Sequence, residues 1–285
     1  MSTLTPKALR RRAAARCVAI TCAALLAGCQ SLGLSGDSGE KYVERPVEDL
    51  YNEAADSLQA RRYKSAAKQF EEVERQHPYS QWAQRSVLMA AYAYYEQAEY
   101  DSAIAAAERY LALHPGSQDA PYAKYLVANS YYEQIADVRR DQEITRRALV
   151  ELTDLVQRYP NTDYARDAKL KIDLARDHLA GKEMAIGRYY LEQKAFVAAI
   201  NRFKVVVTDY QTTTHVEEAL ARLAECYMAI GVANEAQTAA AILGHNYPGS
   251  QWYEDSYVLL QSGGLAPRED SSSWISQAWR RVSPI

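Results

Sequence analysis

The sequence predicts an all-α fold in which a pair of helices repeats five times. The first observation is an alanine that recurs in one register, twelve residues before a proline or its equivalent. The second is that apolar residues follow each alanine at offsets of four and seven, which places all three on one face of a helix. The third is the proline itself, which has no N–H and ends the helix. Five sets share this register: Ala66, Phe70, Val73 and Pro78; Ala103, Ala107, Tyr110 and Pro115; Ala148, Leu152, Leu155 and Pro160; Ala199, Phe203, Val206 and Gln211; Ala236, Ala240, Leu243 and Pro248.

Residues 216–250 show the pattern most completely. Leu220, Leu223, Ala224 and Tyr227 precede a break at Gly231, and the alanine register follows it. This spacing is typical of the tetratricopeptide (TPR) repeat, a helix–turn–helix unit with small residues where its helices cross. One unit cannot bury its own apolar face, so five units in phase predict a TPR-type helical repeat solenoid.

The N-terminal segment 1–28 is typical of a lipoprotein signal peptide rather than of a folded domain. Four arginines precede the apolar run 17–27, which is too short to span a bilayer as a stable anchor. The run ends in Leu26-Ala27-Gly28-Cys29, which resembles a bacterial lipobox. We therefore expect cleavage before Cys29 and its conversion to an N-palmitoyl, S-diacylglycerol cysteine. The alternative is an ordinary signal peptide. Gln30 in place of Asp implies, by analogy with lipoproteins, transfer to the outer membrane.

The charge of the mature chain argues against nucleic acid as a partner. Removal of residues 1–28 takes away five basic residues and leaves 28 basic and 36 acidic ones, a formal charge of −8. Phosphate binding needs a basic field, so this composition disfavours it. Cys226 is the only cysteine after Cys29, which excludes a disulfide within the folded part.

Residues 29–44 are rich in Ser and Gly and predict a flexible, lipidated tether. We expect the first helix to begin near Pro46. His77 and His114 each precede a repeat proline, so we interpret them as helix-end residues rather than metal ligands.

The third repeat is longer than the second. Pro115 and Pro160 are 45 residues apart, whereas Pro78 and Pro115 are 37 apart. The extra residues lie around 135–144, a charged run that includes Arg139 and Arg140. This insertion is either a solvated loop or a side-on binding element, because repeat insertions cluster on one face of a solenoid.

Residues 163–193 contain no proline and carry an apolar stripe at steps of three and four. They predict a long helix that joins two lobes. The N-terminal lobe holds repeats one to three in residues 45–180. The C-terminal lobe holds repeats four and five in residues 181–262.

The repeat pattern stops before residues 263–285. Trp274 and Trp279 share an apolar stripe in this tail, and exposed tryptophans are costly without a partner surface. We expect the tail to cap the last repeat. The alternative is that both tryptophans bind another protein.

The sequence does not predict an enzyme. It has no nucleophile–base pair at useful spacing, no phosphate-binding loop and no set of metal ligands. We therefore expect no cofactor and no metal. A repeat solenoid presents extended surfaces, which suits a binding protein.

Several motifs together resemble the BamD family of the outer-membrane β-barrel assembly (BAM) machinery. They cover residues 26–250 in order: the lipobox at 26–29, His77-Pro78-Tyr79-Ser80, Tyr92-Ala93-Tyr94-Tyr95, Arg158-Tyr159-Pro160-Asn161-Thr162-Asp163-Tyr164 and Gly187-Arg188-Tyr189-Tyr190. Gln211 departs from the expected proline, and the tail lies outside the resemblance.

The resemblance implies a non-enzymatic scaffold, lipid-anchored at the periplasmic face of the outer membrane, that assists the folding and insertion of β-barrel proteins. Its implied partners are the POTRA domain of a BamA-type barrel, other lipoproteins of the complex and unfolded outer-membrane proteins. The C-terminal lobe would meet the POTRA domain, and Arg202 and Asp209 are our candidate contacts because they avoid the packing register. The alternative is a TPR lipoprotein that serves a cell-wall (peptidoglycan) enzyme.

Overall fold

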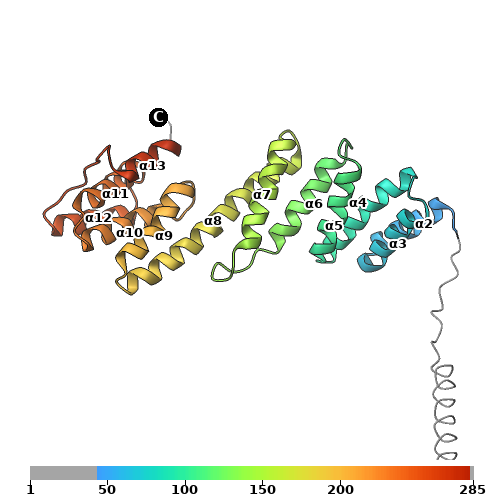
Figure 1. Ribbon diagram of the computed structural model, residues 1–285, viewed down its shortest axis with the longest axis horizontal. Helices are drawn as coiled ribbons and strands as arrows, with labels where there is room; N and C mark the ends of the chain where they lie inside the picture. Colours follow the sequence, from blue (N-terminus) through green and yellow to red (C-terminus); the bar gives the residue numbers. More distant parts are fainter. Residues whose placement is uncertain (1–43, 283–285) are drawn as a thin grey trace, which may run out of the picture. The chain divides into compact units, whose positions relative to one another are not determined.

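A computed structural model describes residues 44–282, and these residues form helices joined by short turns, with no strand among them (Figure 1). The helices are α2 (Val47–Gln59), α3 (Tyr63–Gln76), α4 (Gln81–Glu96), α5 (Tyr100–Leu113), α6 (Ala120–Glu133), α7 (Glu143–Arg158), α8 (Asp163–Glu192), α9 (Phe196–Asp209), α10 (Val216–Ala229), α11 (Ala233–Asn246), α12 (Gln251–Ser262) and α13 (Trp274–Val282). The predicted signal peptide 1–28 and all of the tether except Glu44 lie outside the described residues.

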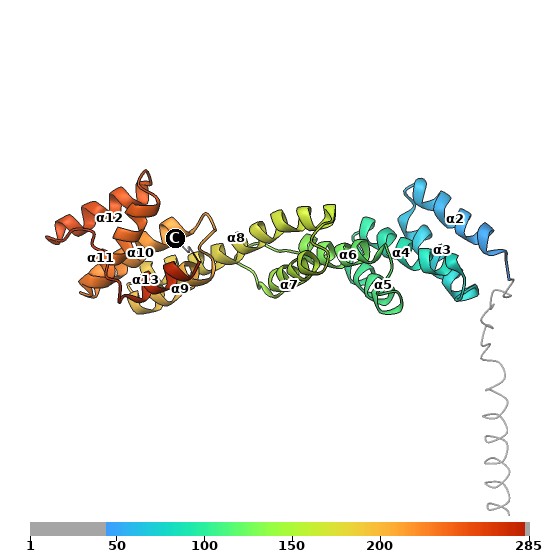
Figure 2. The same ribbon diagram turned by 90° about the horizontal axis from the view of Figure 1, so that it is seen from above.

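Successive helices pack in antiparallel pairs, as the repeat pattern predicts (Figure 2). The pairs are α2 with α3, α4 with α5, α6 with α7, α8 with α9, and α10 with α11. The first helix of a pair also touches the first helix of a neighbouring pair, as α4 does with α6 and α6 with α8, and α10 packs on α12 in the same way. Each repeat therefore buries its apolar face against its neighbours, and the all-α TPR-type fold is confirmed.

The register read from the sequence is the register of the core. All five alanines, and all ten residues four and seven positions after them, have no exposed surface. Gly187 occupies the small position where α8 crosses α9. A Cβ atom there would lie 2.4 Å from Cε1 of Phe203, so the crossing has no room for a methyl group.

Four of the five turns between paired helices repeat one backbone conformation, and the longer α6–α7 connection does not. Arg61, Ala98, Lys194 and Gly231 hold equivalent places and have φ values of 55°, 61°, 58° and 79°. Only one of the four is glycine, the residue for which this left-handed region is unstrained. At the other ends of the pairs, His77 and His114 are C-cap residues whose N–H groups bond to the carbonyls of Val73 and Tyr110. Both histidines thus have the helix-end role that we expected.

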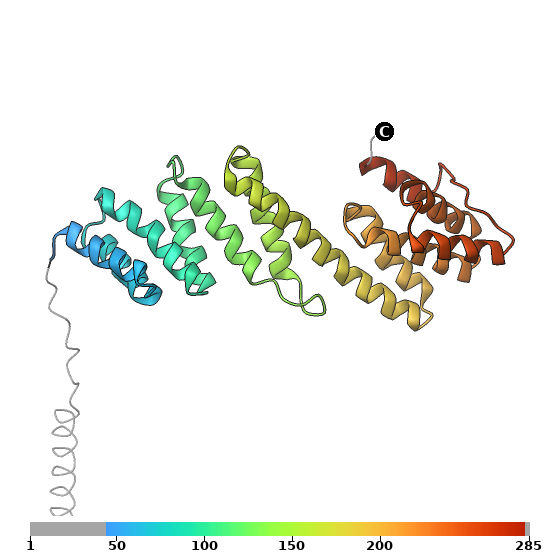
Figure 3. The same cartoon turned by 180° about the vertical axis from the view of Figure 1, so that it is seen from behind.

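Helix α8 is unbroken from Asp163 to Glu192 and is shared by two neighbouring pairs. It packs on both α7 and α9. Figure 3 shows it in yellow, running from the green helices to the orange ones. The largest cluster of buried apolar residues begins at Ala180 and extends to Ile275. The chain from Pro46 onward nevertheless forms a single unit, so the division into lobes 45–180 and 181–262 stays a prediction about function.

Candidate functional site

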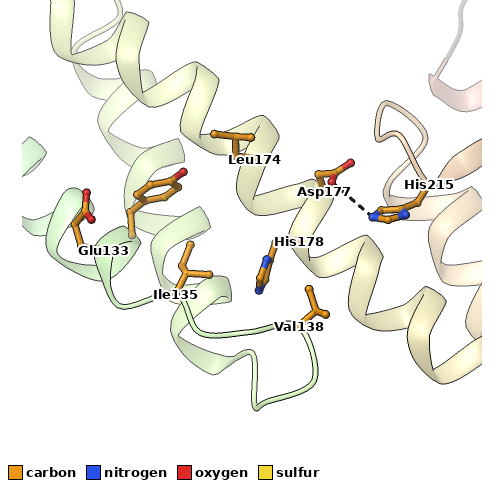
Figure 4. A pocket seen from close by; sticks show the side chains of 8 residues that line it. Glu133, Ile135, Val138, Leu174, Asp177, His178 and His215 are labelled. Atoms are coloured by element: carbon orange, nitrogen blue, oxygen red, sulfur yellow. Dashed lines mark ion pairs between the residues drawn. The ribbon is translucent and has the colours of Figure 1, made fainter.

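A cavity of about 520 Å³ lies where the repeat-three insertion meets the middle of α8 (Figure 4). Its walls come from the end of α6, the insertion, α8 and the residue just before α10. The lining residues are Tyr132, Glu133, Ile135, Val138, Leu174, Asp177, His178 and His215. Two carboxylates and two imidazoles thus surround an apolar floor.

The insertion is fastened to α8 by hydrogen bonds to its own backbone. Nε2 of His178 lies 2.6 Å from the Ala136 carbonyl, which can only accept, so this nitrogen carries the proton. Nζ of Lys182 donates to the Arg139 carbonyl at 3.0 Å. Inside the loop, the buried Gln142 amide donates to the carbonyls of Asp137 and Arg140, both at 3.1 Å. Hydrogen bonds within the loop and to α8 therefore hold residues 134–142 in one conformation.

The side chains of Arg139 and Arg140 are exposed. Nε of Arg139 lies 3.1 Å from Asp137 Oδ1. The backbone N–H of Arg139 also bonds to this carboxylate, and with the guanidinium it lowers the pKa of Asp137. A binding role for the two arginines stays a prediction.

The same stretch of α8 holds the loop before α10. Asp177 Oδ1 accepts hydrogen bonds from the backbone N–H of Thr214 at 3.0 Å and from its hydroxyl at 2.7 Å. Asp177 Oδ2 lies 3.6 Å from Nε2 of His215. Gly181 permits this approach, because a Cβ atom there would lie 3.1 Å from the same imidazole nitrogen. Repeats three and five thus contact neighbouring turns of one helix.

Arg202 and Asp209 lie on α9, two turns apart. Nη1 of Arg202 is 3.1 Å from Glu183 Oε2 on α8, and the Arg202 side chain is 41% exposed. Asp209 is exposed beside Tyr210. The pKa of Tyr210 is raised by burial and then by the charges of Asp209 and Glu183. Both candidates are therefore accessible, as the register predicts, and Glu183 belongs to the same charged surface.

A second charged group, which the sequence did not reveal, links α8, α10 and α12. Nη1 of Arg188 lies 2.7 Å from Glu218, and Arg222 pairs with Glu218 at 3.6 Å and with Glu225 at 2.7 Å. The Arg222 guanidinium lies 5.1 Å from the Trp252 ring centre. Burial lowers the pKa of Arg222, but the pairs with Glu225 and Glu218 outweigh it and raise the pKa. The spacing of 218, 222 and 225 on one helix indicates an ion-pair row, whereas nothing in the sequence brings Arg188 to it.

The C-terminal tail packs against the last repeats, as expected for a segment that caps the solenoid. Nε1 of Trp274 donates to the Tyr227 hydroxyl at 2.9 Å, and Lys204 Nζ lies 4.8 Å from a Trp274 ring centre. Ile275 has no exposed surface, and Trp279 makes an edge contact with Tyr247. Trp274 and Trp279 are both half-buried in these contacts. The amide of Gln211 donates to the Ala278 carbonyl at 3.1 Å.

Cys29, the predicted lipidation site, lies outside the described residues. Across residues 44–282, no helix combines the length and the apolar character needed to cross a membrane. The same residues contain no group of three or more potential metal ligands placed around one point.

Comparison with known proteins identifies the family of the chain. The family model YfiO, described as an outer membrane lipoprotein, matches residues 43–243. Outer membrane protein assembly factor BamD of Caulobacter vibrioides is 52% identical over 252 residues, which cover 87% of this chain and 83% of the relative. The protein of the same name from Rickettsia prowazekii is 44% identical over 238 residues, 84% of this chain and 93% of the relative. The protein of that name from Neisseria meningitidis serogroup A is 35% identical over 235 residues, which cover 79% of this chain and 88% of the relative.

Among solved structures, the chain is similar to the TPR2AB domain of yeast Sti1, with 11% identity and a TM-score of 0.39 over 82% of this chain and 97% of that one. This likeness is too distant to carry an argument. The match of the family model and the identity to the three assembly factors extend over most of the helical repeats. The chain therefore belongs to the family of the outer membrane protein assembly factor BamD.

Proposed function

We propose that this protein is a non-enzymatic scaffold, held at the periplasmic face of the outer membrane by a lipid on Cys29. The family shows an outer-membrane assembly factor, and the lipobox supports the anchor. Several acyl chains on one residue make a strong anchor, since each buried CH₂ contributes about 0.8 kcal/mol. Residues 29–44 would then connect the first repeat to the lipid.

The anchor is tested by Cys29→Ala. Without the thiol there is no acceptor for diacylglycerol, so we expect the variant to incorporate no radioactive palmitate and to be retained as the uncleaved precursor. The unchanged chain, expressed in the same cells, is the control. Palmitate in the variant at the level of the control would rule the anchor site out.

We propose further that the C-terminal repeats bind the POTRA domain of a BamA-type barrel protein. The observation that carries this is the accessible charged surface of Arg202, Glu183 and Asp209, built where α8 and α9 pack. Charged groups at an interface fix orientation and association rate, and loss of a buried partner can cost about 2–5 kcal/mol. The N-terminal repeats are left to receive unfolded barrel proteins, and other lipoproteins of the complex complete the assembly. The relatives' names favour this over service to a cell-wall enzyme.

The test is Arg202→Glu in co-purification from detergent-solubilised envelopes. The variant places a second carboxylate beside that of Glu183 and reverses the charge that residue 202 presents to the partner. We therefore expect the yield of the BamA-type barrel to fall about tenfold or more. Arg166→Glu is the matched control, because Arg166 is exposed on the first half of α8 and makes the same charge change. Circular dichroism checks that helix content is unchanged. Recovery of the barrel at the control level would contradict the assignment.

A further inference from the structure

The turn between α2 and α3 gathers four exposed cations around one hollow. Arg61, Arg62, Lys64 and Lys68 line it together with Tyr63 and Gln97, and its volume is about 600 Å³. We call these four residues the basic turn. They stand within eight residues of one another in a mature chain whose formal charge is −8, so they are a local exception to its overall charge.

The cations of the basic turn lack carboxylate partners. None of the four forms an ion pair among the described residues, and Arg62 has only a 3.4 Å hydrogen bond to the Ser57 hydroxyl. Several arginines on the helix surfaces elsewhere are paired, as Arg109 is with Glu74 at 2.8 Å and Arg188 with Glu218 at 2.7 Å. Among the described residues, no carboxylate therefore lies within ion-pair distance of the basic turn.

This placement opposes the ordinary preferences of a helix. Arg62 is the N-cap of α3, Lys64 lies in its first turn, and that turn contains no acidic residue and no side-chain cap. The N-terminal end of a helix carries partial positive charge, which acidic residues normally complement and cations oppose. Three equivalent helices follow the rule, because α5 has Asp101, α7 has Glu143 and α11 has Glu235 in the first turn, whereas α9 has no acidic residue there. An external anion would relieve the repulsion at α3.

The chain outside the described residues indicates where that anion lies. The tether 29–44 can extend about 50 Å from a lipidated Cys29, and the thirteen residues of α2 add about 20 Å between its end and the basic turn. The basic turn can therefore reach the surface in which the lipid sits. Tyr63 adds an amphipathic ring of the kind that favours a water–lipid boundary.

We infer that the basic turn binds the anionic phospholipid headgroups of the membrane to which the chain is tethered, an inference that rests on the lipid anchor proposed above. Contact at the basic turn fixes which side of the first repeat faces the lipid. The acidic remainder of the chain is repelled by the same surface. One local contact would thus orient the repeats and leave their other surfaces free for protein partners.

The test uses the full mature chain from residue 29, with Cys29→Ala so that no acyl chain contributes. Its partition onto phosphatidylethanolamine vesicles containing phosphatidylglycerol, at about three to one, is measured by sedimentation. Each cation near such a surface strengthens binding about fivefold. We therefore expect Lys64→Gln with Lys68→Gln to lower the partition coefficient roughly 20-fold. Vesicles of phosphatidylcholine alone should bind neither protein.

The matched control is Lys169→Gln with Lys194→Gln, which removes two exposed lysines outside the basic turn and gives the same net charge. It should bind like the unchanged chain. Equal loss in both pairs, or equal binding to neutral vesicles, would overturn the inference. Release by inorganic phosphate at constant ionic strength would assign the hollow to a free phosphate instead. Loss of capture of barrel-protein C-terminal peptides, with vesicle binding intact, would assign it to a peptide carboxylate. Palmitate labelling at Cys29 reports on the anchor separately.

Discussion

The register alanines determine how closely the two helices of each repeat approach. Each is followed one turn later by an apolar residue that is also fully buried, so both residues lie in the core. The largest such neighbours are Phe70 and Phe203. Gly187 brings α8 still closer to Phe203.

We expect Ala199→Leu and Ala236→Leu each to destabilise the fold by about 1–3 kcal/mol, because added methylenes in a packed core force neighbours to shift. Urea unfolding of the purified chain gives the change in midpoint. Val197→Leu is the control, since this side chain is 64% exposed on the same helix as Ala199. Midpoints that match the control at both alanines would show that the crossing tolerates larger residues.

The sequence predicted whether a residue is buried or exposed where equivalent positions in other repeats could be compared. It did not predict contacts between segments that are distant in the sequence. Arg202 could be placed on the accessible side of α9 because five repeats define the buried register. Its partner Glu183, nineteen residues earlier, could not be identified, since the angle of α9 on α8 decides which carboxylate is near. The cavity beside His178 could not be predicted either. Its shape depends on how the insertion folds, and hydrogen bonds from α8 to the backbone of the insertion determine that fold.

At the scale of elements, α13 contacts Gln211, the residue that stands in place of the proline in the fourth repeat. Tyr210, before Gln211, has φ −129° and ψ 36°, close to the values of the residues that precede the prolines. The turn therefore forms without a proline ring. The Gln211 side chain donates to the Val207 carbonyl at 2.6 Å and to the Ala278 carbonyl of α13 at 3.1 Å. A departure from the repeat pattern thus provides an attachment point for the tail.

We expect Gln211→Ala to loosen α13. A hydrogen bond of this kind contributes about 1 kcal/mol, so exchange of the α13 amide hydrogens should quicken roughly fivefold. Hydrogen exchange followed by mass spectrometry of the C-terminal peptides measures it. Thr212→Ala alters the neighbouring, exposed residue and should leave exchange unchanged. Unchanged exchange in Gln211→Ala would mean that the tryptophans hold the tail unaided.

For the whole molecule, the number, order and phase of the helix pairs followed from the sequence because a solenoid makes contacts only between neighbours. The long helix α8 was predicted within one residue at its C-terminal end. What the sequence could not decide was whether the tail would dock, because an apolar stripe fits this chain's surface and a partner's equally well. Docking depended on tertiary features, the Tyr227 hydroxyl and the Lys204 cation among them.

The left-handed turns imply a conflict between stability and function at one of them. A residue with a side chain is strained by about 1–2 kcal/mol in this region of backbone conformation. Glycine removes the strain, but it also raises the conformational entropy of the unfolded chain, which offsets part of the gain in stability. Ala98→Gly and Arg61→Gly should therefore each stabilise the protein by about 0.5–1 kcal/mol in urea unfolding. Only Arg61→Gly should also weaken binding to anionic vesicles, whereas Ala98→Gly leaves it intact. If both variants keep full vesicle binding, Arg61 contributes nothing there. If Arg61→Gly is more stable in urea but binds anionic vesicles more weakly, the strained backbone at Arg61 is the cost of having a positive charge at this position.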